Sequence, residues 1–146
     1  MRDIKINYVD IARPSFHFKM RNYSLFGYDE LIKKFEESFS VEEIGDINYD
    51  VSRSFLLKKM GGLFYVYLSL IGAYCFIMSN GEVISDNKNV ANIIENEITN
   101  TIKLFDITIL TKKDLMDRLP FSIYFESEGQ EIDSVIGLIF APGLFI

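Results

Sequence analysis

Nucleophilic catalysis is the first chemistry that the reactive side chains of this sequence could support. The chain has one cysteine, Cys75, and one histidine, His17. A nucleophile needs a base within hydrogen-bond reach, but His17 lies between Phe16 and Phe18 on a predicted strand, where a solvent-face side chain is expected. Cys75 lies in an apolar run, which is typical of a thiol packed as a small hydrophobic group. We therefore expect neither residue to be catalytic.

Metal binding is the second chemistry to consider. A zinc site needs three or four clustered Cys, His or carboxylate ligands, which one Cys and one His do not supply in the usual sets. The segment Asp86-Asn87-Lys88-Asn89 offers oxygen ligands for calcium. However, Lys88 stands where the EF-hand pattern needs an oxygen, and the glycine and closing glutamate of that pattern are absent. We interpret the segment as a helix cap, and the sequence predicts no metal and no cofactor.

Phosphate binding and carboxylate catalysis remain as chemical alternatives. The glycines match neither the dinucleotide-binding nor the P-loop fingerprint. The 21 Asp and Glu residues leave open a convergent acid and base pair, which spacing along the chain does not reveal. We expect the chain not to be an enzyme, and a small ligand-binding or enzymatic domain that uses carboxylates is the alternative.

An acidic run near the C-terminus is the most informative polar feature. It places Glu126, Glu128, Glu131 and Asp133 within eight residues, with no basic residue among them. Such a run is commonly a solvated loop between strands. Alternatively, it is a docking edge for a basic partner, because complementary charge raises association rate and specificity. We take these four acids as candidate partner-binding residues.

A second acidic and aromatic candidate lies in the first half of the chain. Asp46 and Asp50 flank Ile47 and Tyr49. Tyrosine combines a large contact area with a polar end, which suits a protein interface, although tyrosine near a helix start is also commonly packed inside. Asp46, Tyr49 and Asp50 are therefore added to the candidate partner-binding residues.

Charge and composition narrow the class of partner. The chain has 15 Lys and Arg residues and 21 Asp and Glu residues, so its net charge is −6. This charge repels nucleic acid and anionic membranes and favours a basic protein partner. With 49% hydrophobic residues in a chain of 146, one globular domain over residues 1–146 is expected. The single cysteine and the absence of a signal-peptide pattern indicate a soluble cytoplasmic protein.

The elements that must position these residues centre on an uncharged segment, residues 63–79. A membrane span needs about 20 apolar residues, and Gly72 divides this segment into two runs of strand length. The turn signal Asn80-Gly81 precedes a further short strand at 82–84. The sequence thus predicts an antiparallel meander at about 63–84 and no membrane span.

Helical spacing of apolar residues predicts helices at 28–39 and 89–104. Further patterns predict a helical turn at 40–45, a helix at 50–60 that Gly61 stops, and a short helix that Thr111 begins and Pro120 ends. Additional strands are predicted at 4–8, 16–18, 105–110, 121–125 and 132–140. Without regular βαβ alternation, the fold class is α+β, a central antiparallel sheet packed against three to four helices.

The meander carries a resemblance to a known class of proteins. The resemblance lies in residues Gly61 to Asp86, GGLFYVYLSLIGAYCFIMSNGEVISD, and in the helix at 89–104 that follows them. The chain is also small, acidic and rich in Ile and Asn. In these features it resembles bacterial immunity proteins of contact-dependent inhibition and related polymorphic toxin systems. The resemblance implies stoichiometric binding of a cognate toxin domain, often a nuclease, with its active site blocked. It assigns no contact residue. A homo-oligomeric assembly subunit, which hides Phe and Tyr surface between copies, is a third alternative.

Overall fold

The computed structural model describes residues 21, 23–45, 51–84, 92–125 and 129–140. Several sequence predictions lie outside these residues: the strands at 4–8 and 16–18 with His17, the segment 86–89, and the candidate partner-binding residues Asp46, Tyr49, Asp50, Glu126 and Glu128.

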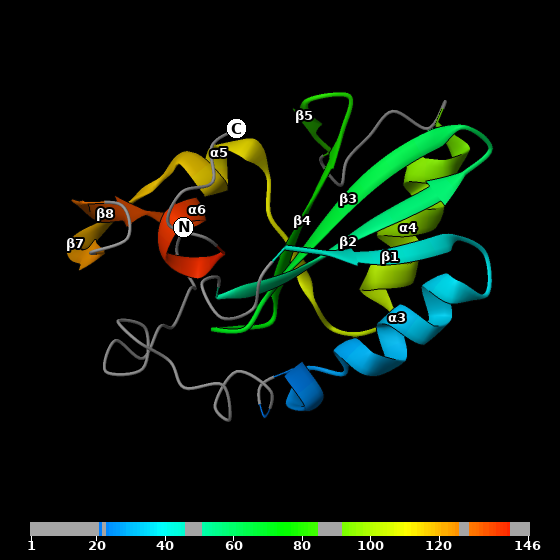
Figure 1. Ribbon diagram of the computed structural model, residues 1–146, viewed down its shortest axis with the longest axis horizontal. Coiled ribbons are helices and arrows are strands. Elements are labelled where there is room, and N and C mark those ends of the chain that lie inside the picture. The colour runs from blue at the N-terminus through cyan, green and yellow to red at the C-terminus, as the bar shows by residue number, and fades with distance from the viewer. Residues whose placement is uncertain (1–20, 22, 46–50, 85–91, 126–128, 141–146) are drawn as a thin grey trace.

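A mixed sheet forms the centre of the fold (Figure 1). Its antiparallel strands follow the order β1 (Ser40–Ile44), β2 (Ser52–Lys59), β3 (Gly62–Ser69), β4 (Tyr74–Ser79) and β5 (Glu82–Val83). The short β6 (Thr108–Ile109) runs parallel to β4. Of the strand predicted at 105–110, only these two residues are in a strand. The predicted α+β class and the meander at 63–84 are confirmed.

Two tight turns fix the register of β2 with β3 and of β4 with β5. The two-residue loops Met60–Gly61 and Asn80–Gly81 join β2 to β3 and β4 to β5. All four loop residues have positive φ, from 50° to 81°, as a type I′ turn requires. The Asn80-Gly81 prediction is confirmed. Gly61, predicted to stop a helix, instead closes a hairpin, because a left-handed glycine serves both purposes.

Two of the predicted helical segments are strands, so those predictions were wrong. The segment 50–60 contains β2, whose Phe55 pairs in register with Glu43 of β1 and Val66 of β3. Residues 40–44, predicted as a helical turn, form β1, in which Val41 packs against the core. In both cases hydrogen bonding between strands outweighs a weak local helix signal, which tertiary context readily overrides.

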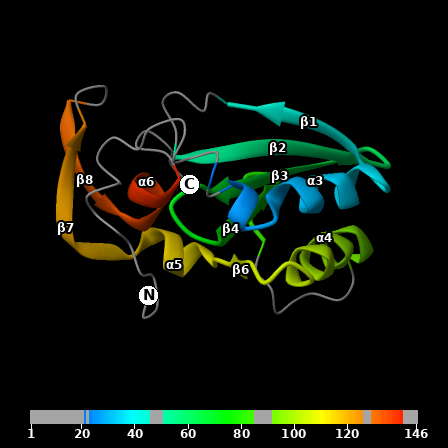
Figure 2. The same cartoon turned by 90° about the horizontal axis from the view of Figure 1, so that it is seen from below.

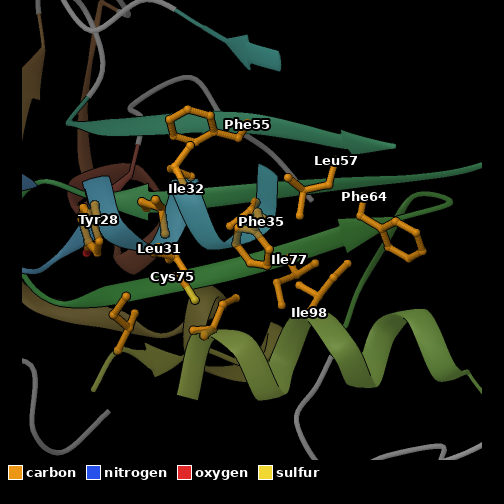
Figure 3. Close-up of a cluster of buried hydrophobic side chains, with 14 of the residues drawn as sticks. Tyr28, Leu31, Ile32, Phe35, Phe55, Leu57, Phe64, Cys75, Ile77 and Ile98 are labelled. Carbon is orange, nitrogen blue, oxygen red and sulfur yellow. The ribbon is translucent and has the colours of Figure 1, made fainter. Parts of the chain in front are cut away.

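Helices α3 (Tyr28–Glu36) and α4 (Ile93–Lys103) cover one face of the sheet (Figure 2). They confirm the predicted helices at 28–39 and 89–104, although α4 begins after Asn92, whose side chain accepts a hydrogen bond from the Glu95 amide at 3.0 Å. Apolar side chains of both helices and of β2, β3 and β4 meet in one cluster (Figure 3). Cys75 is buried in this cluster, as predicted.

On the opposite face of the sheet, the described residues form a second covering layer at one end. There α5 (Lys112–Met116) and α6 (Val135–Ile139) enclose Phe76 in a second apolar cluster. Beside them lies a separate two-stranded sheet of β7 (Arg118–Phe125) and β8 (Gln130–Ser134) (Figures 1 and 2). Strand β4 is therefore buried on both faces, since Cys75 and Ile77 face the first cluster and Phe76 the second.

The C-terminal predictions need two corrections. The cap at Thr111 is present as a capping box with Asp114, but α5 ends at Met116, and Pro120 lies inside β7. Proline is tolerated there because a two-stranded sheet has open edges. The strand predicted at 132–140 ends at Ser134, where its side chain caps α6. Helix α6 is apolar on all sides. In such a short apolar run, periodicity does not distinguish a buried helix from a buried strand.

The uncharged segment 63–79 forms most of β3, the loop at 70–73 and β4. Among the described residues, no helix combines the length and the hydropathy that crossing a membrane requires.

Replacing Gly137 tests the packing of α6 against β8. A Cβ at this position would lie 2.3 Å from Cγ2 of Ile132. Alanine normally favours a helix over glycine by about 1 kcal/mol, so without the clash Gly137→Ala would stabilise the chain. We expect a loss of about 1–3 kcal/mol in unfolding free energy instead, the usual effect of overpacking, measured by urea denaturation. The added methyl should cost much less in an Ile132→Ala background; equal costs in both backgrounds would refute the clash.

The hydroxyl of Tyr28 links α3 to the loop between β3 and β4, donating to the Gly72 carbonyl at 3.1 Å. Burial raises the pKa of Tyr28. The folded chain therefore keeps a proton that the unfolded chain loses above about pH 10, so stability is full below that pH and falls as pH rises. Tyr28→Phe should cost about 1 kcal/mol at neutral pH and lessen the alkaline loss, in urea titrations at several pH values. An unchanged alkaline slope would contradict this, and the exposed Tyr124→Phe is the control.

Candidate protein-binding site

The hairpin of β7 and β8 presents an aromatic and an acidic side chain together. Tyr124 and Glu131 are direct partners in its register, as are Ile123 and Ile132 one step along. Because successive side chains of a strand point to opposite faces, Tyr124 and Glu131 share the face opposite to the buried Ile132. Tyr124 is 59% exposed, and Glu131 is also exposed. Asp133 lies two residues after Glu131 in β8 and is therefore on the same face. We call Tyr124, Glu131 and Asp133 the hairpin face.

Asp133 carries a charge that is already paired. Its carboxylate accepts hydrogen bonds from Nη1 of Arg118 at 2.7 and 3.0 Å, across the hairpin. Arg118 lies outside the acidic run of the sequence. It neutralises one acid of that run, so the run carries less unpaired negative charge than its composition indicates. Glu131 lies in β8 rather than in the loop predicted at 126–131. Of the acids predicted to bind a partner, the structure thus brings Glu131 and Asp133 onto one strand face, with Glu131 available to a partner.

The hairpin is attached to the body of the protein through α6. Ser134 ends β8, and its hydroxyl accepts a hydrogen bond from the Gly137 amide at 3.1 Å. The Val135 amide donates to the carbonyl of Asp117, next to β7, at 3.0 Å. Both strands of the hairpin are therefore tied to the start of one buried helix, which fixes the direction in which the hairpin face points.

The other end of α6 is fixed by two buried serines of the central sheet. Ser52 of β2 donates to the Phe140 carbonyl at 2.8 Å, and Ser69 of β3 donates to the Ile139 carbonyl at 2.7 Å. Carbonyls at a helix end have no partner within the helix. Because Ser52 and Ser69 are register partners, one cross-strand pair reaches both carbonyls and holds α6 on the sheet. The Val51 amide also donates to the Phe140 carbonyl, at 3.1 Å.

A second polar cluster joins Tyr23, Glu43 and Arg53 on the α3 side of the sheet. The Arg53 guanidinium forms a two-point pair with the Glu43 carboxylate, with Nε 2.7 Å from Oε2. Its Cζ lies 4.1 Å from the centre of the Tyr23 ring. Burial raises the pKa of Tyr23, and the hydrogen bond to Glu43 raises the pKa of Arg53. Tyr23 thus stays protonated and Arg53 charged at neutral pH, and the contacts among the three side chains form a structural clamp.

A third polar contact is structural as well. Lys59 lies 2.9 Å from the Glu97 carboxylate and 5.0 Å from the centre of the Phe39 ring, and so connects β2 with α4. Within the ranges that the structure describes, no group of three or more His, Cys, Asp and Glu side chains could hold a metal ion.

Two residues of the candidate site were missed by sequence reasoning. Tyr124 was predicted only as part of a strand, although alternation along 121–125 separates it from its apolar neighbours Ile123 and Phe125 and could have indicated an exposed position. No comparable signal exists for Arg118, because its contact with Asp133 depends on a register that includes an irregularity between Arg118 and Ile123.

The clamp of Tyr23, Glu43 and Arg53 can be tested by Arg53→Met, which retains an apolar stem but removes the charge. The Arg53 side chain is only 17% exposed and the Glu43 side chain 43%. We expect a loss of about 1–2 kcal/mol in unfolding free energy, above the 0–1 kcal/mol that is usual for surface pairs. The control is Lys34→Met, which removes the exposed pair with Glu37 and should cost less than about 0.5 kcal/mol. Equal losses would show that Arg53 forms an ordinary surface pair.

Comparison of the chain with protein-family models, with curated proteins and with solved structures found no match.

Proposed function

We propose that this chain is an inhibitory binding protein, which neutralises a cognate basic protein toxin by forming a stoichiometric complex that blocks the active site of the toxin. The observation that carries the proposal is the exposed pair of Tyr124 and Glu131 on the hairpin face. An aromatic side chain beside an acid is a suitable contact surface for a basic protein.

The two side chains contribute in different ways. A tyrosine loses little conformational entropy on binding, and it offers both apolar ring area and a hydroxyl. A peripheral carboxylate mainly accelerates encounter with a cationic partner and selects against anionic ones. Both would act on a rigid platform, because α6 holds the hairpin at both of its strands.

The charge of the whole chain supports the same class of partner. With a net charge of −6, the protein attracts basic surfaces at long range, and salt weakens this attraction. A toxin that cleaves nucleic acid needs a basic surface to bind phosphates. The resemblance of the meander to immunity proteins of polymorphic toxin systems makes such a nuclease domain the proposed target.

The direct test is co-expression with the products of adjacent reading frames. We expect one product to inhibit growth when expressed alone, this chain to relieve the inhibition, and the two to co-elute at a fixed stoichiometry in size-exclusion chromatography. If no product forms a complex and no toxicity is relieved, the proposal is wrong.

Variants of the hairpin face locate the contact in the captured complex. Glu131→Lys should slow association about tenfold at low salt, with a smaller effect at high salt, and Tyr124→Ala should mainly speed dissociation. The matched control is Glu82→Lys, an equal charge change on the exposed Glu82 of β5, a strand that lies apart from β7 and β8 (Figure 1). Surface plasmon resonance at two salt concentrations separates these effects. Equal slowing by both charge reversals would mean that net charge alone acts, and would remove the hairpin from the interface.

A further inference from the structure

The chain itself contains a site that binds an arginine with a tyrosine and a glutamate. Arg53 lies with its guanidinium over the Tyr23 ring at 4.1 Å and forms two hydrogen bonds with Glu43. The ring attracts the cation through its negative face, and the carboxylate matches the two parallel N–H donors of the planar group. Together these contacts define the geometry that an arginine side chain needs.

Tyr124 and Glu131 of the hairpin face present the same two acceptors, while the cation of that face, Arg118, is paired with Asp133. Tyr124 and Glu131 are direct cross-strand partners, so their Cβ atoms lie about 4.5–5.5 Å apart on one face. Both are exposed, and among the described residues neither takes part in an ion pair or a ring contact. A guanidinium arriving from outside could therefore lie on the ring and reach the carboxylate.

The charges around this pair define where the cation binds. Arg118 already forms an ion pair with Asp133, and the Arg118 side chain is 77% exposed at that end of the hairpin face. A second cation would be repelled there, so the binding position is beside Glu131 and Tyr124. The net charge of −6 repels phosphate-bearing ligands and attracts cationic ones, which favours a basic protein segment as the occupant.

Arginine fits this position better than lysine. The planar guanidinium can stack on a tyrosine ring and pair with a carboxylate at two points at the same time, whereas the ammonium group of lysine is a compact, strongly hydrated point charge. We propose that the hairpin face recognises an arginine side chain of the protein partner, seated between the Tyr124 ring and the Glu131 carboxylate. This inference rests on the proposed function for the identity of the partner, although the arginine site itself can be measured without it.

The experiment is a titration of the full chain, followed by backbone amide NMR at low salt. The probes are a short peptide in which arginines alternate with glycines and the same peptide with lysines. We expect the shifts to concentrate at Tyr124 and Glu131, and the arginine peptide to bind about two- to fivefold more tightly, which is the size of an exposed cation–π contact.

Three variants assign this preference to individual side chains. Tyr124→Leu should remove the preference for arginine and leave a weak, equal binding of both peptides. Glu131→Gln should weaken both peptides, while the control Glu82→Gln should leave the affinities unchanged. Equal affinity of the two peptides for the unaltered chain, or shifts spread over all acidic residues, would overturn the inference.

The outcome also separates this inference from the proposed function. If a toxin is captured but the peptides show no arginine preference at Tyr124, the function stands and the arginine site is wrong. If the arginine preference is present and depends on Tyr124, but no product of an adjacent reading frame is captured, the site stands and the proposed toxin partner is wrong.

Discussion

Burial of strand β4 on both of its faces is the constraint on which the rest of the structure depends. Cys75 and Ile77 face the layer of α3 and α4, while Phe76 faces α6. Phe76 stacks on Tyr67 of β3 with ring centres 4.4 Å apart and meets Phe140 edge to face at 4.7 Å. Burial of each such aromatic side chain contributes about 1.5–3 kcal/mol to the stability of the fold. Strand β4 therefore holds an apolar layer on each of its two faces.

The second of these layers connects packing with the candidate function. Helix α6 is buried all round, and the carbonyls of Ile139 and Phe140 at its end accept hydrogen bonds from Ser69, from Ser52 and from the Val51 amide. Buried acceptors without partners would cost about 1–3 kcal/mol each. The same helix begins at the end of β8, so the orientation of the hairpin face follows from satisfying the polar groups of a buried helix.

Two pairings of tyrosine with glutamate among the described residues illustrate how burial changes the role of the same side chains. In the first pair, Tyr23 is buried and Glu43 is paired with Arg53, so the cluster fastens the β1 and β2 strands beside α3. In the second, Tyr124 and Glu131 lie in solvent. Similar chemistry stabilises the fold at one position and is free to contact a partner at the other.

The sequence alone determined the α+β class, the meander with its Asn80-Gly81 turn, the two amphipathic helices and the burial of Cys75, because each depends on local periodicity or turn chemistry. Only the tertiary structure decided that Ser52–Lys59 is a strand, that a helix follows Ser134, and that Arg118 meets Asp133 while Tyr124 meets Glu131. These features depend on register and on partners distant in the chain. The acidic run was visible as composition, but which of its charges are paired follows from cross-strand contacts, which have no periodic signature in the sequence.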